Sequence, residues 1–401
     1  MISYNEASAL IREEFDKIKP GTELIQIENA LHRTLAEDII SDIFLPSFNN
    51  SAVDGYGIIF GRNMTEWKII GEISAGNYKE FKLNIFDAVK IMTGAKIPDD
   101  VTAVIPIENV TVEDDKINLL PNIKYHSGMN IRKKGSDINK NEIAVKRGTF
   151  LKPRHLAAVA ACGKVNLLVF KKLKFAILAT GDELIPITEK PQNDKIRVSN
   201  TYSLMGEVLE NHQLAVNYGF VNDDKNRIKE IIKKILSSDA EVVLTTGGVS
   251  VGEYDYLKTI FLELGVAQIF WRAYIKPGKP AYFGVHKKND KMKLIFGLPG
   301  NPVSSQVNFK VYIKENVRRL YGMNPTETVK AELINDLRKK DKKRHFMKGL
   351  LTKVNDKYYV TSTISQSSGN LVEMSKANCL IIVKEEQLNP KKGEFVECIP
   401  M

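Results

Sequence analysis

Residues 245–255 have the sequence TTGGVSVGEYD, directly after the apolar run Val242-Val243-Leu244. The apolar run is typical of a buried strand, and the apolar spacing from Tyr256 to Leu264 predicts a helix after the stretch. Glycines and hydroxyl residues between a strand and a helix leave backbone N–H groups free to bind an anion such as phosphate. The glycines and serine of this stretch are therefore candidate ligand-binding residues, namely Gly247, Gly248, Ser250 and Gly252. The same residues also suit a tight turn followed by a helix cap, so both interpretations stay open at this point.

Asp255 stands where the predicted helix begins, and it adds a metal to the hypothesis. A carboxylate there repels a bare anion unless a cation such as Mg²⁺ bridges the two. The stretch therefore favours a phosphorylated ligand that binds together with a divalent metal.

Two other predicted strands end in comparable turns. The run Phe175–Leu178 leads into Thr180-Gly181-Asp182-Glu183, and the run Leu294–Leu298 leads into Pro299-Gly300-Asn301-Pro302. Strands and helices alternate between residues 174 and 264, which predicts βαβ units and a parallel sheet. Because ligands of such sheets bind at the carboxyl ends of the strands, the three turns should line one cleft.

The sequence of the rest of the chain predicts several domains that differ in their secondary structure. A length of 401 residues exceeds one ordinary core. Residues 3–18, about 29–38 and 153–162 have helical spacing, and Ser3 with Glu6 forms a capping box. Short β-like runs fill residues 58–138 and return after Pro325.

Composition limits the function classes. The net charge is +10, but the lysines are scattered, and no aromatic-and-basic nucleic-acid module stands out. No apolar run approaches the length of a membrane span, and the N-terminus lacks the order of a signal peptide. Three widely spaced cysteines without metal or disulfide spacing favour small buried thiols in a reducing cytoplasm.

A pair of lysines around a Pro-Gly turn forms a second candidate site. Lys276 and Lys279 stand three apart in the sequence KPGKP, so both ammonium groups can point to one side and hold a tetrahedral oxoanion. A surface turn with solvated lysines is the alternative. Carboxylates beside glycines or at helix starts are candidate Mg²⁺ ligands if they converge, namely Asp54, Asp137, Asp182, Glu183, Asp223, Asp224 and Asp255. For Asp224, a helix cap is the alternative. No serine or cysteine nucleophile stands out, which favours charge stabilisation over covalent catalysis.

Seven motifs then occur in a characteristic order. They are Ser51-Ala52-Val53-Asp54-Gly55-Tyr56, Ile91-Met92-Thr93-Gly94-Ala95, Ile131–Asp137, Thr180–Leu184, Gly247–Gly252, Lys276–Pro280 and Leu298–Ser304. The set resembles the molybdopterin molybdenumtransferase family, which comprises bacterial MoeA, the gephyrin E domain and the plant Cnx E domain. The resemblance runs from about residue 5 to the C-terminus.

The resemblance implies a multidomain fold of α/β and β parts. Residues 1–45 with 140–172 would form an extended α/β domain, and residues 46–139 a β-rich domain inserted in it. Residues 173–323 would form a three-layer βαβ molybdopterin-binding domain, and residues 324–401 a C-terminal β-barrel. It also implies an elongated homodimer whose active cleft receives the inserted region of the second subunit.

The implied reaction consumes adenylylated molybdopterin and molybdate, releases AMP with Mg²⁺ assisting, and transfers molybdenum to the dithiolene sulfurs. The implied partners are these small molecules, a molybdopterin adenylyltransferase and molybdoenzymes that receive the product, with no nucleic acid and no membrane.

The resemblance also implies residue roles. Molybdate would bind at Lys276, Lys279, Ser304, Arg344 and Ser368. The acids of the molybdopterin-binding domain would be Glu183, Asp223 and Asp255, of which Glu183 and Asp255 would bind Mg²⁺. Asp54, Thr93 and Asp137 would come from the second subunit.

Two other functions remain as alternatives. An adenylyltransferase acting one step earlier shares the βαβ domain with its Gly247-Gly248 turn, and ATP consumption with free molybdopterin would favour it. A non-enzymatic scaffold is suggested by the gephyrin relationship, although the carboxylates and lysines argue against it.

Overall fold

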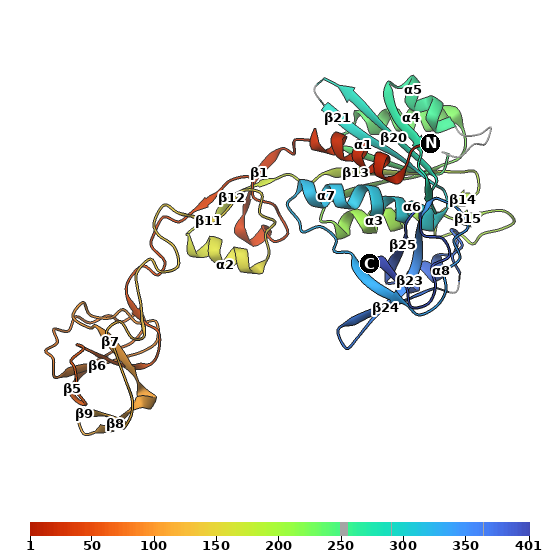
Figure 1. Ribbon diagram of the computed structural model, residues 1–401. Helices are drawn as coiled ribbons and strands as arrows, with labels where there is room; N and C mark the ends of the chain where they lie inside the picture. Colours follow the sequence, from red (N-terminus) through yellow and green to blue (C-terminus); the bar gives the residue numbers. More distant parts are fainter. Residues whose placement is uncertain (249–255, 290, 364) are drawn as a thin grey trace.

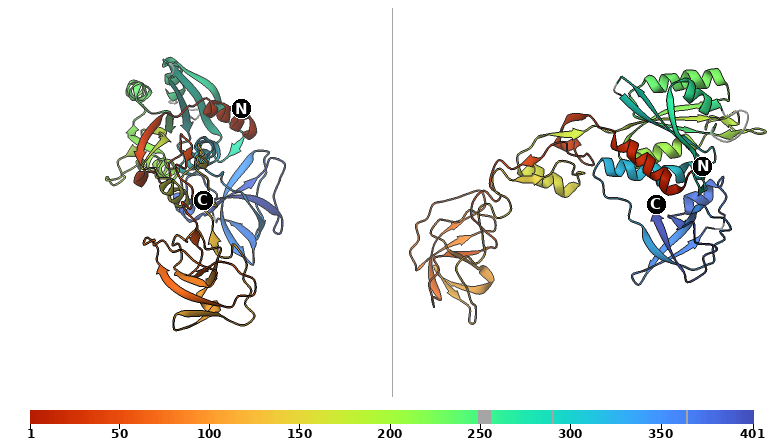
Figure 2. Two further views of the ribbon diagram at one scale, coloured as in Figure 1. Left: turned by 90° about the vertical axis from the view of Figure 1, so that its left-hand side faces the viewer. Right: turned by 45° about the horizontal axis from the view of Figure 1, so that its top comes forward.

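The computed structural model describes residues 1–248, 256–289, 291–363 and 365–401. The molecule is elongated, with a β-rich unit at one end and an α/β unit packed on a small barrel at the other (Figure 1). The right-hand view of Figure 2 shows the same separation from another direction. Within one chain, the β-rich unit therefore lies apart from the α/β unit and the barrel.

The α/β unit is built around a parallel sheet. Its elements are β13 (Lys174–Thr180), β14 (Leu184–Ile185), β15 (Ile196–Arg197), α3 (Asn200–Glu210), β16 (Leu214–Val221), α4 (Lys225–Ser237), β17 (Val242–Thr246), α5 (Tyr256–Glu263), β18 (Val266–Arg272), β19 (Ile275–Lys276), β20 (Pro280–Lys288), β21 (Lys291–Leu298), α6 (Pro302–Asn308), the π-helical segment η3 (Phe309–Lys314) and α7 (Glu315–Leu320). The described strands of the main sheet follow the order β16-β13-β17-β21-β20-β18. The first four strands run parallel to one another. Strand β20 pairs antiparallel with β21, and β18 pairs antiparallel with β20.

Helices cover both faces of this sheet, which gives the expected three layers. Strands β13 and β17 are buried almost throughout, as strands covered on both faces must be. One face packs against α4 and α5, and the other against α3, α6 and α7. Helix α1 (Tyr4–Asp16) packs on that second face through Ala7, Ile11 and Phe15.

The C-terminal unit is a closed barrel. It contains β22 (Val329–Leu333), β23 (Arg344–Val354), β24 (Lys357–Ser362), α8 (Leu371–Lys376), β25 (Cys379–Val383) and β26 (Phe395–Pro400). The strands follow the order β23-β24-β22-β26-β25, and β25 pairs back onto β23. Closure leaves no free sheet edge within the ring, and the short strand β19 of the α/β unit adds to β23 outside it. The predicted barrel is confirmed.

The remaining elements form the extended part and the inserted unit. The extended part contains β1 (Thr22–Gln26), η1 (Ile27–Asn29), β2 (Ile39–Ile40), β11 (Ile143–Val145), α2 (Pro153–Ala161) and β12 (Asn166–Phe170). Here β1 pairs with β12 and β2 with β11, so the N-terminal segment and residues 140–172 lie together. The inserted unit contains β3 (Asn50–Ser51), β4 (Gly55–Ile58), β5 (Glu66–Ile73), β6 (Asp87–Ile91), β7 (Ala103–Pro106), η2 (Ile107–Asn109), β8 (Val110–Glu113), β9 (Lys116–Leu119) and β10 (Ile131–Arg132). Most of its strands form a curled sheet in the order β7-β4-β6-β5-β9-β8.

Of the predictions about single helices, two are confirmed and one is wrong. The capping box at Ser3 and Glu6 is present and begins α1, and α2 matches the predicted helix at residues 153–162. The helix predicted near residues 29–38 is wrong. After η1 the backbone of His32 is left-handed, with φ of 61°, and Thr34 and Leu35 bridge to Phe150 and Val169. Pairing with distant chain segments there outweighs the local apolar spacing.

Three further observations concern the whole chain. The exact domain limits stay a prediction, although α1 shares the core of the α/β unit. All three cysteines are buried and free, as expected: Cys162, Cys379 and Cys398. None of the helices within the described ranges has the length and apolarity to cross a membrane.

Candidate active site

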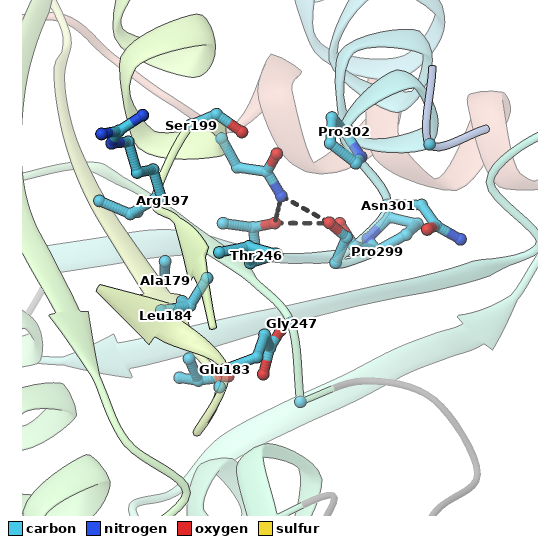
Figure 3. Close-up of a pocket in the computed structure, with 18 of the residues that line it drawn as sticks. Ala179, Glu183, Leu184, Arg197, Ser199, Thr246, Gly247, Pro299, Asn301 and Pro302 are labelled. Atoms are coloured by element: carbon cyan, nitrogen blue, oxygen red, sulfur yellow. Dashed lines mark hydrogen bonds between the residues drawn. The ribbon is translucent and has the colours of Figure 1, made fainter. Parts of the chain in front are cut away.

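The three glycine-containing turns meet at the carboxyl ends of adjacent parallel strands. Ala179, Thr246 and Leu298 are neighbours in register on β13, β17 and β21. The turns that follow them line one cavity of about 650 Å³, part of which is shown in Figure 3. The lining includes Thr180, Gly181, Glu183, Asp223, Gly247, Gly248, Pro299, Gly300, Asn301 and Pro302. The expectation that the turns share a cleft is confirmed.

Gly247 must be glycine for two separate reasons. Its φ of +89° lies in the left-handed region, where a side chain is strained. A Cβ at this position would also lie 2.2 Å from the carbonyl oxygen of Thr180. The bare backbone thus lets the β17 turn approach the end of β13 and keeps peptide groups at the cavity surface.

Asn200, at the start of α3, ties two of the turns together. Its Nδ2 donates to Thr246 Oγ1 and to the carbonyl of Gly300, both at 2.7 Å. Thr246 Oγ1 in turn donates to the carbonyl of Pro299 at 2.9 Å, and these bonds are drawn in Figure 3. Within the described ranges, Thr180 Oγ1 and Asn200 Oδ1 are buried without a hydrogen-bond partner. Both residues line the cavity, so a polar ligand can supply the missing partners.

Two acidic residues are part of the described cavity lining. Glu183 and Asp223 line it, whereas the Asp182 carboxylate accepts a hydrogen bond from the backbone N–H of Asp223 at 3.0 Å. Asp182 therefore positions the loop after β16. Asp224 caps α4 by accepting from the backbone of Asn226 and Arg227.

A complete metal cage does not arise from the described residues, since no group of three or more suitable side chains is present among them. Mg²⁺ commonly binds through one or two carboxylates together with phosphate oxygens and water. Glu183 and Asp223 both line the cavity, as residues of such an incomplete site must. The predicted contributions of Ser250, Gly252 and Asp255 lie outside the described residues.

A second cavity of about 790 Å³ adjoins the first one and shares Pro280, Pro299 and Asn301 with it. Its wall comes from the Lys276–Lys279 turn, from α6 and from the barrel. The polar lining includes Lys276, Lys279, Ser304, Asp336, Arg338, Lys343, His345, Thr363, Gln366, Ser367 and Ser368. We call this second cavity the anion pocket.

The two walls of the anion pocket are fastened to each other. Strand β19 pairs with β23, so that Lys276 lies opposite His345. The backbone N–H of Val303 on α6 donates to the carbonyl of Ser368 at 3.1 Å. Buried Lys348 holds the serine loop by donating to the carbonyl of Ser367 at 2.9 Å. Lys276 and Lys279 form no ion pair within the described part of the chain, so their charges are available to an anion.

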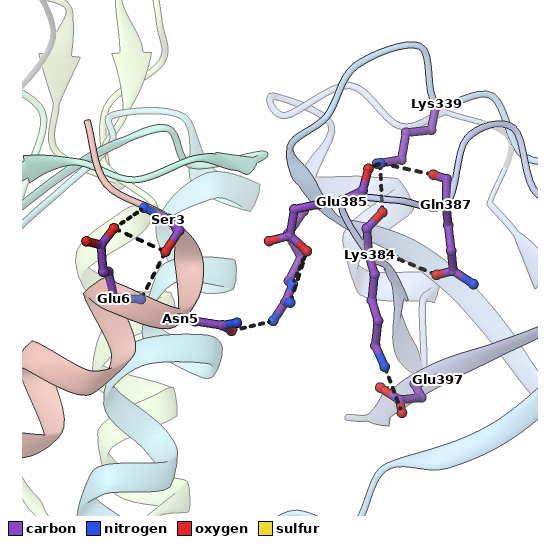
Figure 4. Close-up of polar contacts among 9 residues, drawn as sticks. Ser3, Asn5, Glu6, Lys339, Lys384, Glu385, Gln387 and Glu397 are labelled. Carbon is purple, nitrogen blue, oxygen red and sulfur yellow. Dashed lines mark hydrogen bonds and ion pairs between the residues drawn. The ribbon is translucent and has the colours of Figure 1, made fainter.

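Arg344 does not line this pocket, contrary to the predicted arrangement. Its guanidinium donates to Glu385 Oε2 at 3.0 and 3.1 Å and to Asn5 Oδ1 at 3.1 Å, and it lies over the Tyr4 ring. These contacts fasten α1 to the barrel (Figure 4). Lys343, one residue earlier, lines the pocket instead. The physical reason for the difference is that the bonds to Glu385 and Asn5 hold the guanidinium of Arg344 away from the pocket lining.

Asp54 and Thr93, which were assigned to the second subunit, flank β4 and β6 of the inserted unit, and Figure 1 shows this unit at one end of the molecule. Asp137 follows β10, and its backbone N–H donates to the carbonyl of Leu45 at 2.9 Å. Thr93 donates to Asp54 Oδ1 through its backbone N–H at 2.6 Å and its hydroxyl at 2.7 Å. These bonds, the backbone one foremost, lower the pKa of Asp54. Ser136 Oγ donates to Asp137 at 3.2 Å. Their catalytic roles stay a prediction, because a single chain does not bring them to the two cavities.

Sequence reasoning missed several lining residues, namely Arg197, Ser199, Asn200, Arg338, Lys343 and His345. Ser199-Asn200 at the start of a helix is a readable signal, because helix N-termini favour anionic ligands. The basic residues near the barrel had no such signal, since they lie in a lysine-rich surface segment.

A parallel sheet with bare glycine turns at its carboxyl ends, continuous with a pocket lined by lysines, is typical of α/β enzymes that act on small molecules. Three family models match consecutive parts of the chain: MoeA N-terminal region (domain I and II) at residues 2–163, a probable molybdopterin binding domain at 176–319, and MoeA C-terminal region (domain IV) at 330–401.

Whole-chain relatives agree with these models. A molybdopterin molybdenumtransferase of Haemophilus influenzae is 31% identical over 100% of this chain and 98% of its own length. One from Bacillus subtilis is 30% identical over 94% and 89%. The crystal structure of the molybdopterin biosynthesis moeA protein from Pyrococcus horikoshii OT3 superposes with a TM-score of 0.83 at 29% identity, covering 100% of both chains. The chain belongs to the molybdopterin molybdenumtransferase family, and it is an enzyme of molybdenum cofactor biosynthesis.

Proposed function

We propose that this enzyme binds adenylylated molybdopterin and molybdate, cleaves off the AMP and transfers molybdenum to the dithiolene sulfurs. One observation carries the proposal. The glycine-lined cavity and the anion pocket share Pro280, Pro299 and Asn301, so a nucleotide-capped pterin and a metal oxoanion can lie side by side.

In the first cavity, the chain's own residues bind and orient the phosphorylated substrate. Backbone N–H groups at the Gly247-Gly248 turn suit phosphate oxygens. The unpartnered oxygens of Thr180 and Asn200 suit donors of the ligand. Glu183 and Asp223 would hold Mg²⁺, which supplies charge neutralisation at the phosphates when it is bound.

In the anion pocket, Lys276 and Lys279 would bind molybdate, with Ser304 and Ser368 donating hydroxyl hydrogen bonds. Ser304 is buried at 3% exposure on α6, which fixes its position. Lys343 adds a further cation from the barrel side. Fixed donors around a tetrahedral dianion stabilise it most where water is excluded.

The proposal is tested by supplying purified enzyme with adenylylated molybdopterin, Mg²⁺ and molybdate, and by measuring AMP. AMP release that depends on molybdate and Mg²⁺ is the expected result. No AMP release under these conditions, or ATP consumption with free molybdopterin, would contradict it. The second outcome would indicate an adenylyltransferase. The predicted cytoplasmic location and the partner enzymes remain part of the proposal.

A homodimer with shared active sites is part of the same proposal, because Asp54 lies between β3 and β4 of the inserted unit, which Figure 1 shows far from the α/β unit and the barrel. Co-expression of Asp54→Asn and Lys279→Ala subunits under different affinity tags tests it. Each variant alone should be inactive, while the mixture should recover about a quarter of wild-type activity, since half of the dimers are mixed and each restores one site. A mixture as inactive as its parents would mean that Asp54 acts within its own chain.

Neighbouring residues Lys343 and Arg344 offer a matched pair of variants. Arg344→Gln removes the contacts to Glu385, Asn5 and Tyr4, and should lower stability by about 1–2 kcal/mol without weakening molybdate binding. Lys343→Gln removes a cation from the anion pocket. It should weaken molybdate binding about fivefold and leave the stability unchanged. Urea unfolding and molybdate titration calorimetry measure the two effects. If Arg344→Gln weakened molybdate binding and Lys343→Gln did not, Arg344 would belong to the molybdate site.

A further inference from the structure

The described wall of the anion pocket contains a single histidine, His345. The other basic groups of the lining belong to Lys276, Lys279, Lys343 and Arg338, and they suit charge pairing with an oxoanion. The pKa of Asp336 is lowered by hydrogen bonds from the Lys392 backbone and the Lys391 ammonium, so this carboxyl stays ionised. Imidazole is the side chain whose ordinary pKa suits proton transfer near neutral pH.

His345 is held in place by a carboxylate. The residue is 4% exposed on β23, and its Nε2 lies 2.8 Å from Asp341 Oδ1. Asp341 also accepts a hydrogen bond from the backbone N–H of Lys343 at 3.0 Å. This carboxylate fixes the ring orientation and stabilises the imidazolium form.

The charged groups around His345 come from three segments. Asp341 precedes β23, Lys276 lies opposite on β19, and buried Lys339 lies on the loop before Asp341. The β25 neighbour is the uncharged Val383. Burial lowers the pKa of His345, Asp341 opposes that shift, and the two lysines add to it. The free pocket therefore favours neutral imidazole, and a bound dianion reverses that preference.

The proposed reaction needs a proton at the oxoanion. When molybdate and two thiols combine, two Mo–S bonds form, one Mo–O bond breaks, and the two thiol protons leave with that oxygen as water. Molybdenum stays in its +6 state, and the total charge is unchanged. A poor leaving oxide becomes water only if an acid delivers a proton to it, and a thiol can then restore that acid.

We propose that His345, oriented by Asp341, takes up a proton when the oxoanion binds and delivers it to the oxygen that leaves as water. This inference rests on the proposed function, and it adds a proton donor to the cationic pocket. Lys276 and Lys279 hold the oxoanion, while His345 changes its charge with occupancy. The affinity for molybdate then falls as the pH rises, because His345 in the complex loses its proton. The fall is at most tenfold per pH unit.

Calorimetric titration of the full-length enzyme with molybdate alone, in buffers of different ionisation enthalpy, measures the protons taken up. The wild type should take up protons near neutral pH, and His345→Gln should lose that uptake and the pH dependence of affinity. Asp341→Asn should move the pH window downward, because the imidazolium loses its carboxylate. His286→Gln changes another buried histidine, on β20 away from this pocket, and should behave as the wild type.

The outcomes separate this inference from the proposed function. Equal proton uptake by the wild type and His345→Gln, with molybdate-dependent AMP release intact, would overturn the inference alone. A wild type that neither binds molybdate nor releases AMP would overturn both. Equal unfolding midpoints of His345→Gln and the wild type exclude misfolding as the cause of a lost uptake.

Discussion

Replacing Lys279 with alanine should reduce molybdate-dependent AMP release by about 100- to 1000-fold, the size of effect typical for losing one preorganised donor to a developing charge. The turn that carries Lys279 is held by Asn308, whose Nδ2 donates to the carbonyl of Gly278 at 3.2 Å. Gly278 itself has a φ of +98°, a left-handed backbone conformation that suits glycine. The ammonium group is therefore already placed at the pocket before the substrate arrives.

Varying the molybdate concentration makes the Lys279→Ala test specific. Loss of a binding cation should raise the KM for molybdate and leave the affinity for the pterin substrate unchanged, because Lys279 lines only the anion pocket among the two described cavities. Lys287→Ala is the matched control, since this lysine is exposed on β20 and lines neither cavity. Equal AMP release and equal KM in the two variants would remove Lys279 from the site.

Those parts of the fold that depend on local motifs and on the spacing of apolar residues were predictable from the sequence. Ser3 and Glu6 form the expected capping box, and the apolar runs at β13, β17 and β21 are the buried parallel strands. Parallel strands place their carboxyl ends at one edge, so the meeting of the three turns follows from the order of strands and helices alone.

The missed features depend on contacts between distant segments. Residues 29–38 have helical spacing, yet Thr34 and Leu35 pair with segments more than a hundred positions away. The absence of Arg344 from the pocket lining depends on its contacts with Asn5 and Glu385, which lie far from it in the sequence. The dyad of His345 and Asp341 joins two residues four apart across a loop, and nothing in their types distinguishes them from surface residues.

Gly247→Ala should abolish binding of the pterin substrate, with a loss of at least 100-fold, and lower stability by about 1–3 kcal/mol through backbone strain. The added Cβ meets the Thr180 carbonyl at 2.2 Å, so the β17 turn must move away from the end of β13. That movement displaces the peptide groups at the cavity and separates Thr246 from Asn200 and Pro299, to which it is hydrogen-bonded.

Gly219→Ala isolates the steric part of this effect. Gly219 also has a positive φ, of +76°, and lies in β16 of the same sheet, but a Cβ there meets nothing within 4 Å. Both variants should therefore lose comparable stability from left-handed backbone, while Gly219→Ala keeps the wild-type affinity for the pterin. Substrate titration by fluorescence and urea unfolding measure the two quantities. Equal affinities in the two variants would mean that the close approach of Gly247 to Thr180 does not shape the binding cavity.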